Sequence, residues 1–306
     1  MSQFPNKSIL AATDFSEYSK TALNICLGVY RCMKTKLYVL HTIEKIPQDY
    51  RHLPSGTALA DMKRKLEVDA IEKIKAMIPE DIVEKGDIIP IVRFGKPFLE
   101  IIQVAKENSV DLLVIGTHGR AGVDRVILGS VAERIVRKAP CPVMVIKGRK
   151  FTGFKRIIVP IDFSDCSRKA LEYAIATAGA HKSRLTILHV YEESFIEPYV
   201  NAANSEEEAG EIMKEIERVN ETKYDEFLKT IDLRSVEYDK LLIKGIPETE
   251  IVETAAEQQA DLVVMGTHGR AGLKHILIGS TAEEVVRTVH CDIIILKPEN
   301  FSFSMP

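Results

Sequence analysis

The feature that most constrains this chain is an internal repeat. The segment DLLVIGTHGRAGVDRVILGSVAERIVRKAPC begins at Asp111, and DLVVMGTHGRAGLKHILIGSTAEEVVRTVHC begins at Asp261. About half of the aligned positions are identical, without a gap, and most of the others exchange one aliphatic residue for another. A repeat of this length predicts two copies of one domain.

Shorter matches extend the repeat toward the start of each half. The matched pairs are ILAATDFS from Ile9 with IIVPIDFS from Ile157, YVLHT from Tyr38 with TILHV from Thr186, and FGKPFLEII from Phe94 with KGIPETEIV from Lys244. The separation of matched positions grows by two after Val190, which indicates an insertion there. The joint KGRKFTGFK is basic, has two glycines and lacks periodicity, as a linker does. We therefore expect domain 1 over residues 1–147, a linker over 148–155 and domain 2 over 156–306.

Bulk properties agree with an ordinary two-domain protein. The 306 residues suit two domains of ~150 residues each. The net charge of -3 gives no basic footprint for nucleic acid, and no apolar run approaches the ~20 residues that span a membrane. The N-terminus lacks an apolar signal core, and the five cysteines form no CxxC pair. We expect reduced thiols and a cytoplasmic location.

Each half alternates strand-like and helix-like segments. In the first half, the expected strands are 8–13, 37–41, 88–92, 111–116 and 142–146, and the expected helices follow Ser16, cover 58–78, and begin at Pro97 and at about Ser130. This alternation predicts an α/β fold with two tandem open parallel five-stranded sheets and helices on both faces. The first and fourth strands are continuous aliphatic runs, which are typical of strands buried on both faces. Ligands of such sheets bind beyond the carboxyl ends of the strands, at the switch point beside the first strand.

Two loops should meet at this switch point. The first carries Asp14, or Asp162 in the second half, and the second has the spacing G-x2-G-x9-G-S. Its members are Gly116, Gly119, Gly129 and Ser130 in the first half, and Gly266, Gly269, Gly279 and Ser280 in the second. Glycines allow close approach of the backbone to an anion, and a helix N-terminus at Ser130 favours negative charge. Asp14 could accept a hydrogen bond from a ribose hydroxyl or an adenine amine, and Thr42 and Val190 could offer backbone groups to a base edge.

Structural roles compete with these readings. Glycines after a strand are often turn formers, and Asp14 could cap the following helix. His118 and His268 fit loop residues bonded to backbone as well as ligand contacts, and His41 and His189 fit packed residues better than functional ones. The chain lacks GxxxxGK[ST], GxGxxG after the first strand, and GxSxG. It also lacks paired carboxylates near the phosphate loop, which favours binding over turnover.

The glycine motif, together with the strand endings TDFS and IDFS, resembles the universal stress protein family in its tandem form. The resemblance covers nearly the whole chain, twice, and implies an adenine nucleotide alpha hydrolase-like fold with strand order 3-2-1-4-5. It also implies ATP binding, with Mg²⁺ held through the phosphates where it is present. Half one reads Ala-Ala-Thr-Asp where family members and half two have proline, so Ala12 could loosen the adenine side of the first site.

The resemblance implies a set of ligand-binding residues in each half. Near the adenosine it implies Asp14, Thr42 and Ile115, with Asp162, Val190 and Met265 as counterparts. Near the phosphates it implies Gly116, His118, Gly119, Gly129, Ser130 and Val131, with Gly266, His268, Gly269, Gly279, Ser280 and Thr281 as counterparts. It implies no catalytic residue and no metal ligand from the protein.

Three functions remain open at this point. The first is a regulatory ATP-binding protein that supports stress tolerance. The second is a slow ATPase or a nucleotide-transferring enzyme, and the third is a ligand-free scaffold with segments 43–59 and 191–210 as partner surfaces. The apolar last strands predict that the two halves pack as a pseudo-dimer, with a possible homodimer beyond it.

Overall fold

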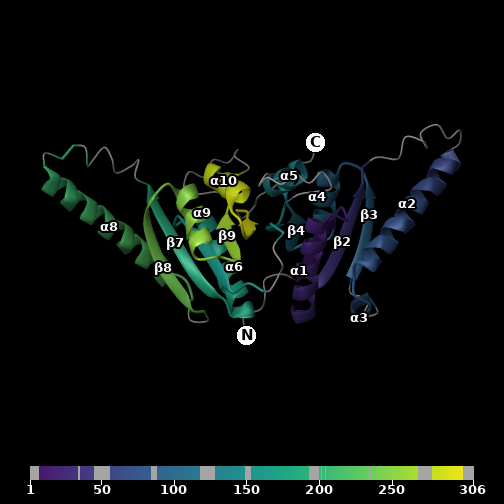
Figure 1. Cartoon of the computed structure of the whole chain (residues 1–306), viewed down its shortest axis with the longest axis horizontal. Coiled ribbons are helices and arrows are strands. Elements are labelled where there is room, and N and C mark those ends of the chain that lie inside the picture. Colours follow the sequence, from purple (N-terminus) through teal and green to yellow (C-terminus); the bar gives the residue numbers. More distant parts are fainter. Residues whose placement is uncertain are drawn as a thin grey trace. The chain divides into compact units, whose positions relative to one another are not determined.

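The computed structural model describes residues 7–33, 35–44, 56–83, 88–117, 128–148, 153–192, 200, 202–203, 205–233, 236–267 and 278–298. The chain divides near residue 152 into two compact units. We call the unit with the first five strands the N-terminal half and the other the C-terminal half. In Figure 1 each half has its own strands with helices packed around them.

The N-terminal half is a parallel α/β unit. In chain order its elements are β1 (Ser8–Thr13), α1 (Glu17–Met33), β2 (Lys36–Ile43), α2 (Gly56–Ala76), α3 (Glu80–Val83), β3 (Ile88–Phe94), α4 (Pro97–Glu107), β4 (Leu112–Gly116), α5 (Ser130–Lys138) and β5 (Val143–Ile146). Its strands lie in the order β3-β2-β1-β4-β5. Every described pairing among them is parallel.

The C-terminal half repeats this arrangement. Its elements are β6 (Arg156–Ile161), α6 (Asp165–His181), β7 (Arg184–Glu192), α8 (Glu206–Lys229), β8 (Tyr238–Gly245), α9 (Pro247–Glu257), β9 (Leu262–Gly266), α10 (Ser280–Thr288) and β10 (Asp292–Leu296). The order β8-β7-β6-β9-β10, again with parallel pairings, is the 3-2-1-4-5 order implied by the resemblance.

Burial on both faces explains the aliphatic composition of the central strands. Leu10 in β1 and Leu113 in β4 are fully buried, as are their C-terminal counterparts Ile158 and Val263. Neighbouring residues of a strand point to opposite faces, so a run buried at every position requires cover on both sides. The expectation for the first and fourth strands is confirmed.

Helices supply this cover. α1 packs on β1, β2, β4 and β5, whereas α4 packs against α5 and β2. Since crossovers between parallel strands are right-handed, α1 and α2 lie on one face and α4 and α5 on the other. α6 contacts β6, β7, β9 and β10, and α9 packs against α10, so the second half has the same layers.

Observed element bounds differ from the expected ones where neighbours or proline intervene. β1 has the expected bounds, whereas β2 extends beyond 37–41 because its pairing with β3 continues to Ile43 opposite Phe94. α2 ends at Ala76, two residues before the expected end. Pro79 follows shortly, and proline disfavours helical backbone in the residue before it.

Cys26, Cys141, Cys166 and Cys291 are buried. Within the described ranges, no helix is long and apolar enough to cross a membrane.

One carboxylate in each half ties the start of the first strand to the start of the fourth. Asp111 Oδ2 accepts hydrogen bonds from the backbone N and the Oγ of Ser8, both at 2.9 Å. Asp261 Oδ2 accepts from the backbone N atoms of Lys155 and Arg156, also at 2.9 Å. The repeated aspartate therefore has a structural role, since it fixes the register at the amino end of the sheet.

Replacing Asp261 with alanine should lower the melting temperature of the C-terminal half. The change removes two solvent-exposed hydrogen bonds, each worth about 0.5–1 kcal/mol. For a unit of this size we expect a decrease of about 2–8 °C by differential scanning calorimetry. Glu253→Ala, at an exposed position of α9, is the control. Equal melting temperatures for the two variants would contradict this role.

Candidate functional site

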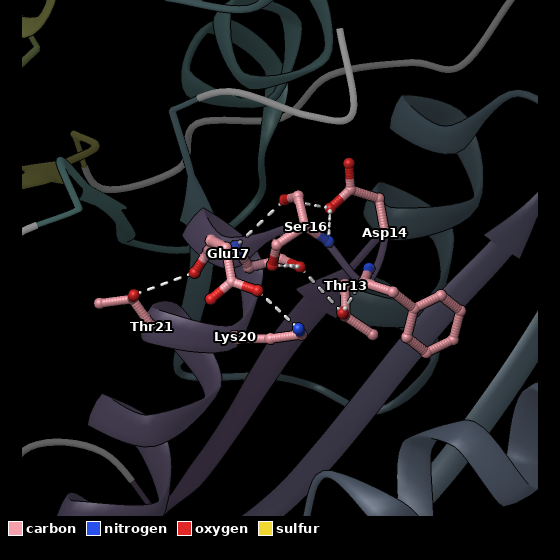
Figure 2. A network of polar contacts seen from close by, with 8 residues as sticks. Thr13, Asp14, Ser16, Glu17, Lys20 and Thr21 are labelled. Atoms are coloured by element: carbon pink, nitrogen blue, oxygen red, sulfur yellow. Dashed lines mark hydrogen bonds and ion pairs between the residues drawn. The ribbon is translucent and has the colours of Figure 1, made fainter. Parts of the chain in front are cut away.

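The turn after the first strand of each half holds a carboxylate in a fixed orientation. Asp14 Oδ1 accepts hydrogen bonds from the backbone N of Ser16 at 3.1 Å and from its Oγ at 2.6 Å (Figure 2). Asp162 accepts the same two bonds from Ser164 at the same distances. Figure 2 shows the other carboxylate oxygen of Asp14 pointing away from Ser16. One oxygen of each carboxylate thus fixes the turn.

The serine of this turn, and not the aspartate, caps the following helix. Ser164 is the N-cap of α6, and its Oγ accepts a hydrogen bond from the backbone N of Ser167 at 3.2 Å. Ser16 Oγ accepts from the backbone N of Ser19 at 3.3 Å. The capping role considered for Asp14 therefore belongs to Ser16, and Asp14 orients the capping residue.

The Asp14 carboxylate is ionised at neutral pH. Partial burial raises its pKa, but hydrogen bonds from Ser16 and Ser19 more than offset this effect, so the pKa lies below its ordinary value. An ionised carboxylate only accepts hydrogen bonds. It suits a ligand that offers hydroxyl or amine donors.

The histidine of the second strand buttresses the same turn. His41 Nδ1 donates to the carbonyl of Thr13 at 2.8 Å, and its ring lies 4.4 Å from that of Phe15. His189 repeats the bond with Ile161 at 2.8 Å, and its ring lies 4.2 Å from that of Phe163. These contacts agree with the packing role expected for both histidines.

A helix N-terminus without a side-chain cap faces the same edge of each half. Gly129 is the N-cap of α5 and Gly279 is the N-cap of α10, and neither helix has a side-chain capping bond. Their backbone N atoms donate to the carbonyls of Thr117 at 2.9 Å and Thr267 at 2.7 Å. The first amides of such a helix favour an anion.

Helix packing gives a further reason for the first glycine of the motif. A Cβ at Gly116 would lie 2.9 Å from Tyr18 Cβ, and one at Gly266 would lie 2.6 Å from Cys166 Sγ. α1 and α6 therefore pack directly on these residues. A glycine that the motif associates with phosphate is also required where helix and strand come into close contact.

The C-terminal half contains a cavity of about 1070 Å³ at the carboxyl ends of its strands. Seven of the nine expected residues of this half line it: Asp162, Val190, Met265, Gly266, Gly279, Ser280 and Thr281. The other two, His268 and Gly269, lie outside the described residues. Pro160, the counterpart of Ala12, also lines the cavity. Two loops and two strand ends that are distant in sequence thus contribute to one cavity.

In the N-terminal half, the expected residues lie at the equivalent positions. Asp14 follows β1, Thr42 is in β2, Ile115 and Gly116 end β4, and Gly129, Ser130 and Val131 begin α5. His118 and Gly119 lie outside the described residues. Within the described part of this half, Thr42 Oγ1 is a buried hydroxyl without a hydrogen-bond partner. A buried polar atom of this kind is costly unless a ligand or water completes it.

Sequence reasoning missed one wall of the cavity. Ile212, Ile216, Val219 and Lys223 of α8 line it, although none was expected at a site. The only sequence signal was the insertion after Val190. It marks segment 191–210 as variable, but it does not indicate that α8 lines the site.

The described residues contain no group of three His, Cys, Asp or Glu side chains that could hold a metal ion.

Comparison with known proteins places the fold and the repeat in one family. The model of the universal stress protein family matches residues 5–147 and again residues 153–297. Universal stress protein MJ0531 of Methanocaldococcus jannaschii is 35% identical over 148 residues, which is 47% of this chain and 82% of that protein. Universal stress protein Rv2005c of Mycobacterium tuberculosis is 25% identical over 79% of both chains.

Among solved structures, a universal stress protein from Archaeoglobus fulgidus shares the fold. The TM-score is 0.63 with 21% identity, over 98% of this chain and 99% of that one. The family match covers both halves of the chain, each with the strand order and switch-point turn described above. The chain belongs to the universal stress protein family.

Proposed function

We propose that this protein is a regulatory ATP-binding protein that supports stress tolerance, with one nucleotide at the switch point of each half. The observation that carries the proposal is the C-terminal cavity, which gathers seven residues expected to bind nucleotide. A cytoplasmic location is part of the proposal, and the scattered spacing of the five cysteines, without a CxxC pair, supports it.

The anion end of the cavity suits the phosphates. Gly279 leaves room for a close approach to the start of α10, where the amides of Ser280 and Thr281 and the Ser280 hydroxyl are donors. The Thr281 hydroxyl itself donates to Glu248 at 3.3 Å, so the backbone of Thr281 is its contribution. Mg²⁺ would be held mainly through phosphate oxygens.

The adenosine end suits polar recognition beside apolar walls. The Asp162 carboxylate, oriented by Ser164, would accept from a ribose hydroxyl or the adenine amine. Val190 and Met265 would contact the apolar faces of the ligand. In the N-terminal half, Thr42 offers its buried hydroxyl at the position of Val190.

Amides and hydroxyls can hold a phosphate chain, but they do not take a proton from an attacking water. The donors at the start of α10 therefore support binding as the main activity.

Denaturing the freshly purified protein should release ATP at about two per chain, one for each half. Chromatography and mass spectrometry of the released molecules check the identity and the amount. Gly129→Val and Gly279→Val should each reduce the yield to about half, since the added side chain fills the phosphate cradle. A Cβ at either position would lie 3.0–3.1 Å from a backbone carbonyl oxygen, so the neighbouring backbone must shift by a few tenths of an ångström.

Far-UV circular dichroism of the two variants serves as the folding control. If the wild-type protein releases no nucleotide and calorimetry detects no binding of added ATP, the proposal fails and the scaffold function remains. Steady phosphate release that disappears in Gly129→Val would instead support the ATPase.

Thr42→Val should weaken ATP binding to the N-terminal site by about 3- to 10-fold, because one hydrogen bond to the ligand is lost. Titration calorimetry in the Gly279→Val background measures this site alone. The stability of the ligand-free protein should stay the same or rise, because valine removes an unsatisfied polar atom.

Thr35→Val is a matched control, because Thr35 Oγ1 is a buried hydroxyl without a hydrogen-bond partner and directly precedes β2, whose other end carries Thr42. This control should leave the ATP affinity unchanged. Equal affinity changes in both variants would show that Thr42 does not contact the nucleotide.

A further inference from the structure

Helix α8 presents an aliphatic stripe to the cavity of the C-terminal half. Ile212, Ile216 and Val219 are spaced by four and three residues, which puts them on one face of the helix. All three line the cavity and are partly exposed. At 1.5 Å per residue the stripe is about 10 Å long.

The C-terminal end of α8 holds this stripe in place. The Tyr224 hydroxyl donates to the carbonyl of Ile187 in β7, and the Phe227 ring lies 5.5 Å from that of Phe163. Figure 1 shows α8 diverging from β8 toward its N-terminal end. α8 is therefore anchored through its C-terminal end, and the stripe nearer its N-terminal end lines the cavity.

In the N-terminal half, the equivalent helix α2 is covered by protein side chains more completely than α8 is. In α2, Met62, Ala70 and Ile74 are buried along the length of the helix. In α8 the buried residues are Tyr224 and Phe227, both near the C-terminal end. The stripe on α8 therefore has more apolar surface left to bury than α2 has. Contact with an apolar ligand would stabilise the complex by roughly 25 cal/mol per Å² of apolar surface buried.

Strand order assigns the stripe to the base end of a bound nucleotide. β7 and β9 lie on opposite sides of β6, and the anion end belongs to α10, which follows β9. α8 is anchored on β7, and Val190 at the end of β7 lines the same cavity. A nucleotide with its phosphates at Ser280 therefore extends its base toward α8.

Charge also excludes phosphate from this end. Glu192, Glu211 and Glu215 are exposed residues that line the cavity near α8, Glu215 is paired with Arg218, and Lys223 is the single lysine or arginine among the described lining residues. The remaining negative charge disfavours a phosphate modestly, because solvent screens it, and it tolerates a neutral base. A cavity of about 1070 Å³ is also at the upper limit of the ~300–1,000 Å³ range for one drug-sized ligand. Both features leave space next to the base for a neutral apolar group.

We propose that the C-terminal site prefers an adenine nucleotide whose base carries an apolar substituent, which packs beneath α8 on Ile212, Ile216 and Val219. This inference rests on the proposed nucleotide binding and adds a ligand class to it. The long stripe provides contacts that an unsubstituted purine uses only in part.

The test compares ATP with N6-benzyl-ATP by titration calorimetry in the Gly129→Val background, where only the C-terminal site is intact. We expect the benzyl derivative to bind about tenfold more tightly or better. Ile216→Asp should weaken the binding of N6-benzyl-ATP more than that of ATP and so reduce this ratio to less than about twofold. Lys214→Gln, at an exposed position of the same helix, should preserve the ratio, and circular dichroism checks that each variant is folded.

Three results would overturn the inference while nucleotide binding stands. These are equal or weaker binding of N6-benzyl-ATP, a ratio that persists in Ile216→Asp, and equal weakening of both ligands by Ile216→Asp. The last result would mean that the stripe covers the unsubstituted purine. If neither ligand binds, the proposed function itself fails, and the inference fails with it.

Discussion

The burial of the central strands on both faces is the constraint on which the rest of the structure depends. β1, β4, β6 and β9 carry aliphatic side chains at nearly every position, because helices cover both sides of them. Polar groups therefore concentrate at the strand ends. Since all described pairings are parallel, the carboxyl ends meet at one edge of each half. Asp14 and Asp162 lie there because the turn is the first position after the strand where a charge remains solvated.

The two halves share the parallel-sheet arrangement and the aspartate turn, but they differ in the helix that follows the second strand. The aspartate turn has the same hydrogen-bond distances in both copies, and its phenylalanine has a φ of 67° in one and 66° in the other. The helix after the second strand has buried residues along its length in the N-terminal copy, but only near its C-terminal end in the C-terminal copy. Duplication allows this difference, because one site can change its outer wall while the other keeps the original one.

The repeat and the central strands of each sheet were predictable from the sequence, whereas the wall of the cavity formed by α8 was not. The repeat fixes the number of halves, and aliphatic runs fix the central strands, because both signals are local and strong. The contribution of Ile216 was not predictable, because an aliphatic stripe on a helix normally indicates core. Only the packing of Tyr224 and Phe227 directs that stripe over a cavity. The role of Gly266 beneath Cys166 is also a matter of tertiary contact, which the motif does not encode.

The charges of the cavity determine the orientation of any anionic ligand in it. Carboxylates of Asp162, Glu192, Glu211 and Glu215 line the base side, whereas the start of α10 supplies amides and the positive end of a helix dipole. A phosphate chain is repelled from the first region and stabilised in the second. The reversed orientation would place several negative charges near these carboxylates and away from the amides at the start of α10. Electrostatics therefore orients an anionic ligand with its charged end at α10. Selection among bases depends on the apolar surfaces at the opposite end of the cavity, beside α8.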